Sequence, residues 1–263
     1  MKRNLTIILA GAALLALAGC SREPLAEVAG NEMLVAEIVD DALTRTSYDG
    51  NTGKFAWTEG DKIALFLAKQ GQNPRTQETK VTPATDRKGT FIYSKETGWS
   101  RTGYAVYPAG VAKSLTVNNA LTLTLPTAYD LSNSTSVQLP MVAANSSGET
   151  SGLAFKAACG LLRIKCEGLT AATVTVTLDK GITGDFAVDN PGSAPTISAA
   201  EATASNTTVT FTLPSASTSA ELNLPLPCGR YGSVSVSNGS STKTETSPFT
   251  MDRGEGKKLH ITF

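Results

Sequence analysis

The segment Leu121-Thr-Leu-Thr-Leu125 alternates strictly between large apolar side chains and threonine. The same alternation recurs in Val174-Thr-Val-Thr-Leu178 and in Val209-Thr-Phe-Thr-Leu213. Successive side chains of a β-strand point to opposite faces, so each segment would turn its apolar residues to a core and its threonines to water. These segments therefore predict strands that are buried on one face and solvated on the other.

The composition extends this prediction to the whole chain. Its 263 residues include 35 Thr and 23 Ser, and only 6% of the residues are aromatic. β-Branched side chains lose freedom in helices and pack well on sheets. Beyond the extreme N-terminus no segment predicts a helix longer than two turns, so we expect an all-β fold, a sandwich or barrel of short strands. The expected strands span residues 33–39, 62–67, 90–93, 104–107, 121–125, 139–143, 153–157, 161–166, 173–178, 185–188, 207–213, 221–226, 233–237 and 258–263.

The first twenty residues carry an export signal. Two basic residues precede an apolar run at 5–18, and the run ends in Leu17-Ala-Gly-Cys20. This arrangement is typical of a secretory signal peptide, and the run is too short for a membrane span, which needs roughly 20 residues. Small residues before Cys20 resemble a bacterial lipobox, so we expect residues 1–19 to be removed and Cys20 to be acylated. Ordinary secretion with an incidental cysteine is the alternative.

A polar segment divides the mature chain. Asn145-Ser-Ser-Gly-Glu-Thr-Ser-Gly152 consists of small, polar and turn-forming residues, which predicts a linker. We therefore expect a tether at 20–32, an N-terminal domain at 33–152 and a C-terminal domain at 153–263.

Charge and histidine content exclude several functions. The chain has 23 Lys plus Arg and 23 Asp plus Glu, so its net charge is zero and nucleic acid is not an expected partner. His260 is the only histidine, and its place in an alternating terminal segment predicts a solvent-facing side chain. The sequence contains no nucleophile elbow, phosphate-binding loop or metalloprotease motif. We expect no enzyme activity, no metal site and no cofactor.

Asp61 and the cysteines could in principle carry chemistry, but structural roles explain them better. Asp61 ends the segment Trp57-Thr-Glu-Gly-Asp61, where a turn-stabilising role is favoured over general acid catalysis because no nucleophile is nearby. After export Cys159, Cys166 and Cys228 remain, and an odd number of cysteines cannot form a complete disulfide framework. We expect three reduced, buried thiols.

Short motifs follow one another in a distinctive order along the mature chain. They read Leu-Thr-Arg-Thr at 43–46, Phe-Ala-Trp-Thr-Glu-Gly-Asp-Lys-Ile at 55–63, Tyr-Ala-Val-Tyr-Pro at 104–108, Leu-Pro-Thr at 125–127, Leu-Pro-Met-Val-Ala at 139–143, Phe-Lys-Ala-Ala-Cys-Gly-Leu-Leu-Arg-Ile at 155–164 and Met-Asp-Arg-Gly-Glu-Gly-Lys-Lys-Leu-His-Ile at 251–261. In this order they resemble the fimbrillin-like lipoproteins, or type V pilins, of Bacteroides-type bacteria. The resemblance spans nearly the entire mature chain.

The resemblance implies a fold and a way of assembling. It implies two β-sandwich domains with transthyretin-like topology, at 33–152 and 153–263, in an outer-membrane lipoprotein that serves as a fimbrial (pilus) subunit or adhesin. It also implies that an Arg-specific protease removes the N-terminal strand, and that a strand from another pilus subunit fills the vacated groove. On this chain the removed strand would be Met33–Val39 and the scissile bond would follow Arg45. An exposed loop arginine that is never cleaved is the alternative.

The subunit type and the ligand stay open. Phe263 follows the last expected strand directly and leaves no obvious donor segment, so we expect a tip, minor or anchor subunit. A host protein or glycan would be its ligand. The alternative function is a glycan-binding surface lipoprotein of a nutrient-uptake system, with Trp57 and Trp99 as sugar platforms, although both also suit a core. A hydrolase would require acidic residues that converge in one cleft.

Overall fold

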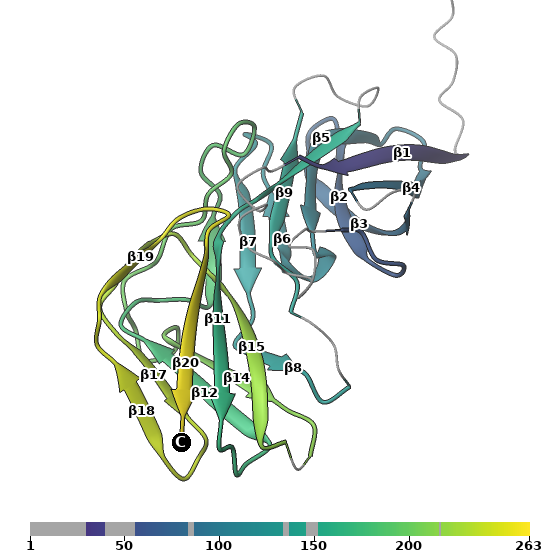
Figure 1. Ribbon diagram of the computed structural model, residues 1–263. Helices are drawn as coiled ribbons and strands as arrows, with labels where there is room; N and C mark the ends of the chain where they lie inside the picture. Colours follow the sequence, from purple (N-terminus) through teal and green to yellow (C-terminus); the bar gives the residue numbers. More distant parts are fainter. Residues whose placement is uncertain (1–29, 40–55, 84–86, 134–136, 146–151, 216) are drawn as a thin grey trace, which may run out of the picture.

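The computed structural model describes residues 30–39, 56–83, 87–133, 137–145, 152–215 and 217–263. Within these ranges the protein is built from β-strands, which confirms the all-β prediction. The only helix in the described ranges is a single 3-10 turn at Ala109–Val111. No helix of this part of the chain is long and apolar enough to cross a membrane. Figure 1 shows two lobes, one above the other, with β6 and β7 between them.

The upper lobe is a closed barrel, called here the barrel lobe. Its strands follow one another around the ring in the order β1-β10-β9-β5-β2-β3-β4. Every neighbouring pair is antiparallel except β1 and β10, which run parallel. The strands are β1 (Gly30–Ile38), β2 (Lys62–Lys69), β3 (Gln72–Pro83), β4 (Lys88–Lys95), β5 (Ser100–Tyr107), β9 (Met141–Ala144) and β10 (Leu153–Ala157).

The lower lobe consists of several smaller sheets. Their strand orders are β15-β11-β20, β18-β17-β12-β14-β8 and β16-β19, and a further sheet, β13-β7-β6, lies beside the barrel. The strands are β6 (Ala112–Leu115), β7 (Leu121–Leu125), β8 (Ala128–Asp130), β11 (Gly160–Glu167), β12 (Thr173–Leu178), β13 (Gly184–Ala187), β14 (Thr208–Thr212), β15 (Ser219–Leu226), β16 (Gly229–Tyr231), β17 (Val234–Ser237), β18 (Thr242–Glu245), β19 (Phe249–Met251) and β20 (Gly256–Thr262).

The alternating segments form strands as predicted. In β7 all three leucines are buried, and the two threonines between them are only partly covered. β12 and β14 repeat this pattern, and their threonines lie opposite one another, with a hydrogen bond between the hydroxyls of Thr177 and Thr208 at 3.1 Å. The period of two in the sequence is therefore the period of burial in the sheet.

Three strands pair across the domain boundary that the linker at 145–152 predicts. β10 begins at Leu153, the first residue of the expected C-terminal domain, yet it pairs with β1 and β9 of the barrel. β8 pairs with β14 of the lower lobe, and β13 pairs with β7. The physical reason for the placement of β10 is burial: Leu153, Phe155 and Ala157 fill the barrel core, and this gain does not depend on the polar residues that precede them. The chain thus passes to the lower lobe after β10.

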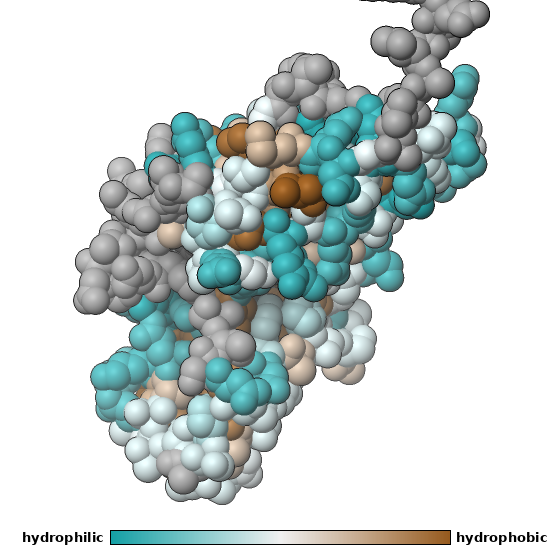
Figure 2. Space-filling model, turned by 90° about the vertical axis from the view of Figure 1, so that its right-hand side faces the viewer, coloured by the Kyte–Doolittle hydropathy of each residue, from teal (hydrophilic) through white to brown (hydrophobic). Residues whose placement is uncertain are grey.

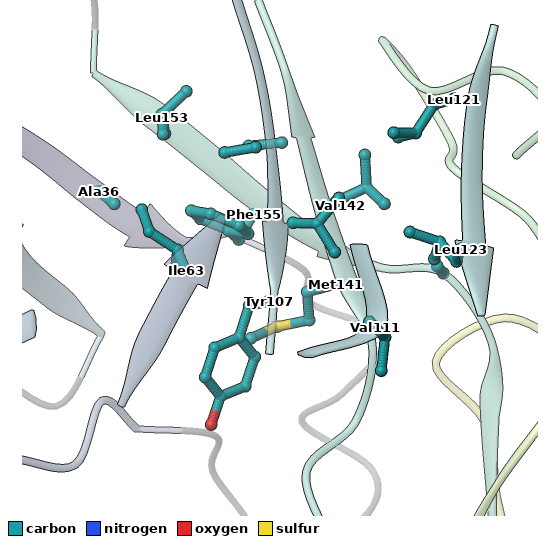
Figure 3. Close-up of a cluster of buried hydrophobic side chains, with 14 of the residues drawn as sticks. Ala36, Ile63, Tyr107, Val111, Leu121, Leu123, Met141, Val142, Leu153 and Phe155 are labelled. Carbon is teal, nitrogen blue, oxygen red and sulfur yellow. The ribbon is translucent and has the colours of Figure 1, made fainter. Parts of the chain in front are cut away.

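Each lobe has its own apolar core. The barrel core also includes β7 and residues from later in the chain, among them Phe186 and Ile197. Figure 3 shows part of this cluster, with Ala36 and Ile63 on one side and Leu121 and Leu123 on the other. The second core lies between the sheets of the lower lobe around Phe211 and Tyr231.

Candidate functional site

The first strand of the barrel is the candidate site, because the resemblance to fimbrillin-like lipoproteins implies that this strand is removed and replaced. β1 lies between β4 and β10 and completes the ring. It pairs with β4 over eight residues, from Gly30 opposite Lys95 to Glu37 opposite Lys88, and with β10 over three, from Ala36 to Ile38. Strand 33–39 was expected, and β1 confirms it with a start three residues earlier, within the expected tether.

The inner face of β1 closes the core of the barrel. Leu34, Ala36 and Ile38 are 5%, 0% and 2% exposed, and they alternate with solvent-facing residues. Figure 3 shows Ala36 next to Ile63 and Phe155. Burying one leucine or isoleucine side chain contributes about 1.5–3 kcal/mol. Three alternate side chains therefore hold β1 in the groove between β4 and β10.

Polar contacts fix both ends of β1. At its start the Glu32 carboxylate accepts a hydrogen bond from the Tyr93 hydroxyl at 2.5 Å and pairs with the Lys95 ammonium at 3.1 Å. At its end the Ile38 carbonyl accepts a hydrogen bond from Arg87 Nε at 2.7 Å. The Ile38 amide donates to the Arg87 carbonyl at 2.9 Å. These contacts set the register of the strand, and the sequence did not predict them because their partners lie some fifty to sixty positions away.

The pH dependence of the Glu32 contact gives a first prediction. The hydrogen bond from Tyr93 is the largest cause that lowers the pKa of Glu32 from its ordinary 4.5; Lys95 adds to this effect and partial burial opposes it. A carboxyl whose pKa is lower in the folded state contributes stability above its unfolded pKa and loses it as pH falls through the folded pKa. We expect Glu32→Gln to destabilise the protein by less than about 1 kcal/mol at pH 7, since the group is partly solvated.

Urea denaturation at pH 7 and at pH 3 measures this effect. The difference in unfolding free energy between wild type and Glu32→Gln should shrink toward zero at the lower pH. Tyr93→Phe, which removes only the hydroxyl, should reproduce part of the same dependence. A difference that stays constant over this range would contradict the assignment.

The outer face of β1 is unusually apolar. Met33 lies directly opposite Ile92 of β4, and these side chains are 74% and 60% exposed. Val35, two residues along the same face, is 48% exposed. Figure 2 views the molecule from the β1–β4 side and shows brown, hydrophobic atoms among teal ones on the barrel lobe. β1 thus has apolar side chains on both faces, although only one face is covered in this chain.

The two residues predicted to be processed lie outside the described ranges. Cys20 precedes β1 in the sequence, and Arg45 lies between β1 and β2. A cut after Arg45 would therefore break the 39–61 segment that joins β1 to β2.

The two tryptophans are not open platforms for a sugar. Trp57 is 5% exposed and packs edge to face against Phe91, Tyr107 and Phe155 at centroid distances of 5.2–5.4 Å. The guanidinium of Arg75 lies 4.3 Å from the ring centroid of Trp99. Both rings are already in contact with protein, as the core interpretation predicts.

The other residues weighed for chemistry have structural roles. Asp61 accepts hydrogen bonds from the Thr58 amide at 2.9 Å and from Gln138 Nε2 at 2.7 Å, and burial raises its pKa. It stabilises the turn before β2, as predicted. The His260 side chain is 55% exposed and lies 3.2 Å from Glu167 on the outer face of β20.

The cysteines agree with the prediction of free thiols. Cys159 and Cys166 are buried and Cys228 is half-buried, and none forms a disulfide. Burial raises the pKa of Cys166 and Cys228 to about 11, so their thiols stay protonated at neutral pH. Among the described residues there is no group of three or more His, Cys, Asp or Glu side chains placed to hold a metal ion.

Comparison with known proteins gives matches among solved structures only. No family model matches the chain, and no curated protein matches it. Solved structures that align with most of the chain include candidate cell adhesion proteins and a fimbrial protein of Bacteroides.

The individual alignments are long, with low sequence identity. A candidate cell adhesion protein from Bacteroides ovatus aligns over 88% of this chain and 91% of its own, with 13% identity and a TM-score of 0.49. One from Bacteroides uniformis aligns over 89% and 93%, with 19% identity and a TM-score of 0.46. A fimbrial protein from Bacteroides ovatus aligns over 87% of this chain and 50% of its own, with 14% identity and a TM-score of 0.36.

Proposed function

We propose that this chain is a cell-surface lipoprotein that acts as a fimbrial subunit or adhesin and assembles by β-strand exchange. The observation that carries the proposal is the position of β1. It is the first strand of the described chain, it closes a ring of seven, and no other strand of the described residues precedes Arg45. The motif order that resembles fimbrillin-like lipoproteins supports the same function.

Loss of β1 would create a site for another strand. The backbone groups of β4 and β10 that now bond to β1 would lose their partners, and the side chains under Leu34, Ala36 and Ile38 would meet water. Unpaired strand edges and exposed apolar surface both favour the addition of a strand from another chain. The partner strand would need small or apolar residues at alternate positions to fill the same groove.

Acylation of Cys20 would bring the protein to the outer membrane. Gly30, where β1 begins, lies ten positions after Cys20, and an extended chain spans at most about 36 Å over ten positions. Several acyl chains anchor a protein durably, since each buried methylene contributes about 0.8 kcal/mol. The lipid would therefore hold the barrel lobe near the membrane until a cut after Arg45 releases it.

The lower lobe fits a tip, minor or anchor subunit of the pilus better than a subunit of its stalk. β20 pairs with β11 over seven residues, from Gly256 opposite Leu161 to Thr262 opposite Glu167. The last strand is thus occupied within its own lobe, which favours a subunit that receives a strand over one that donates it. We include in the proposal the absence of catalysis and of a cofactor. The transthyretin-like arrangement of two sandwich domains stays a prediction.

Arg45→Ala tests the processing step in cells. We expect wild-type protein extracted from the cell surface to begin at Thr46 and to occur in large assemblies that resist denaturation, whereas Arg45→Ala should keep β1 and stay monomeric. Arg22→Ala is the matched control, because this arginine precedes β1 and its loss should leave assembly unchanged. A mature wild-type form that begins only at Cys20 would contradict strand removal.

A further inference from the structure

A cavity of about 680 Å³ opens on the side of the barrel lobe. Strands β5, β9 and β10 form its floor, and the turns after β6 and β13 form its rim. Its lining consists of Thr102, Gly103, Tyr104, Asn119, Ala144, Asn145, Ala154 and Gly192. Its volume lies within the range of about 300–1,000 Å³ that is usual for small-ligand sites.

The floor of the cavity is held by the β5–β9 ladder. Tyr104 lies opposite Ala144, and the Asn145 amide donates to the Gly103 carbonyl at 3.0 Å. The two backbones approach so closely that a Cβ atom on Gly103 would lie 1.7 Å from the Asn145 carbonyl oxygen. Asn145 Nδ2 also donates to the Gly152 carbonyl at 3.1 Å. The floor is therefore fixed before any ligand arrives.

Two tight turns form the rim. Asn119 and Asn190 are the only non-glycine residues with positive φ in the described part of the chain, at 62° and 48°. The Asn119 amide donates to the Thr116 carbonyl at 3.0 Å, which closes the first turn. The Ser193 amide donates to the Asn190 carbonyl at 3.1 Å, and this second turn places Gly192 at the cavity. Both turns are hydrogen-bonded and so present their residues in set positions.

The chemistry of the lining selects a class of ligand. None of the lining residues within the described part of the chain carries a charge, in contrast to the smaller cavity over β11, where Arg163, Lys165 and Glu221 meet. The lining combines an aromatic ring, hydroxyls and side-chain amides with small Ala and Gly residues. Such a surface suits a ligand with apolar C–H faces and many hydroxyls, whereas an anion or a metal ion would find no counter-charge.

We propose that this cavity binds a neutral oligosaccharide, with the Tyr104 ring as the apolar contact and Asn119 as a hydrogen-bonding group. The inference rests on the adhesin role proposed above and names the ligand class for it. Tyr104 packs partly against the barrel core, so its ring is held in place by the fold. Neither Trp57 nor Trp99, the sugar platforms of the alternative function, lines this cavity.

Binding to a glycan array tests the proposal on the full mature chain. The array carries neutral, sialylated and sulphated oligosaccharides, and the neutral oligosaccharide that binds most strongly is then titrated by calorimetry. Asn119→Gly removes the amide and keeps a residue that tolerates positive φ. Gly192→Trp narrows the cavity from an exposed turn on its rim, where a Cβ atom would meet nothing within 4 Å. Asn118→Gly is the matched control, since this exposed neighbour does not line the cavity.

We expect at least one neutral oligosaccharide to bind. Asn119→Gly should weaken binding about fivefold, the equivalent of one lost hydrogen bond, and Gly192→Trp should abolish it, whereas Asn118→Gly should bind as wild type does. All three variants should assemble normally, which separates this test from that of strand exchange. The proposal is overturned if no neutral glycan binds, if only charged glycans bind, or if both cavity variants bind as tightly as wild type.

Discussion

Replacing Leu34 with aspartate should release β1 from the barrel. The Leu34 side chain is 5% exposed and faces the core opposite Phe91, so the variant would place a carboxylate among apolar side chains with no partner. Losing a buried leucine costs about 2–5 kcal/mol, and burying an unpaired charge adds to that cost. We expect Leu34→Asp to lower the unfolding free energy by at least about 3 kcal/mol and to make the β1 segment sensitive to proteases.

Val35→Asp is the matched control for this change. Val35 is the next residue along the same strand, but its side chain points outward and is 48% exposed. We expect its unfolding free energy to stay within about 0.5 kcal/mol of wild type. Urea denaturation and limited proteolysis of both variants measure the contrast. Equal effects at the two positions would mean that β1 is not seated with Leu34 inward.

The local pattern of the sequence was enough to predict many strands. Where large apolar residues alternate with threonine, as in β7, β12 and β14, periodicity alone gives both the strand and its buried face. The exposed position of His260 followed from the same alternation. Asp61 was recognised as a turn residue from its neighbours. Each of these features depends on residues that are close in sequence.

Strands defined by their partners were missed. β3 (Gln72–Pro83) is twelve residues long and mostly polar, and only Thr79 and Val81 are buried in it, so no alternation marks it. It exists because β2 and β4 hydrogen-bond to its two sides. β18 (Thr242–Glu245) is exposed throughout and is a strand only through its pairing with β17. Pairing with a distant strand leaves no recognisable pattern in the sequence of the strand itself.

The candidate site at β1 was only partly predictable from the sequence, because some of its contacts join residues that are far apart in the chain. The strand 33–39 was predicted from the sequence, and its removal was implied by the family resemblance. The inward position of Leu34 was not predicted, because apolar residues lie on both faces of β1. The parallel pairing of β1 with β10 joins residues more than a hundred positions apart, and this pairing places β10 in the barrel. The cavity around Tyr104 also combines five segments of the chain, none of which carries a recognisable binding motif.

The largest effect that we expect is the replacement of β1 by a strand from another chain. Once the chain is cut after Arg45, β1 is held only by side-chain burial and hydrogen bonds, while before the cut the connection to β2 keeps its local concentration high. A free peptide with the sequence of β1 should therefore exchange with β1 after the chain is cut. It should not exchange with β1 in the uncut chain. The inner residues of that strand decide whether it is accepted.

Strand replacement can be measured directly on the purified chain. The protein is cut after Arg45 with an Arg-specific protease and mixed with an excess of a fluorescent peptide of the sequence Gly30–Val39, in buffer and in mild urea. We predict that one peptide per chain is incorporated, as judged by native mass spectrometry, and that uncut protein and a peptide with Leu34→Asp show no incorporation. Cut protein that takes up no peptide even in urea, or uncut protein that takes it up equally well, would contradict strand exchange.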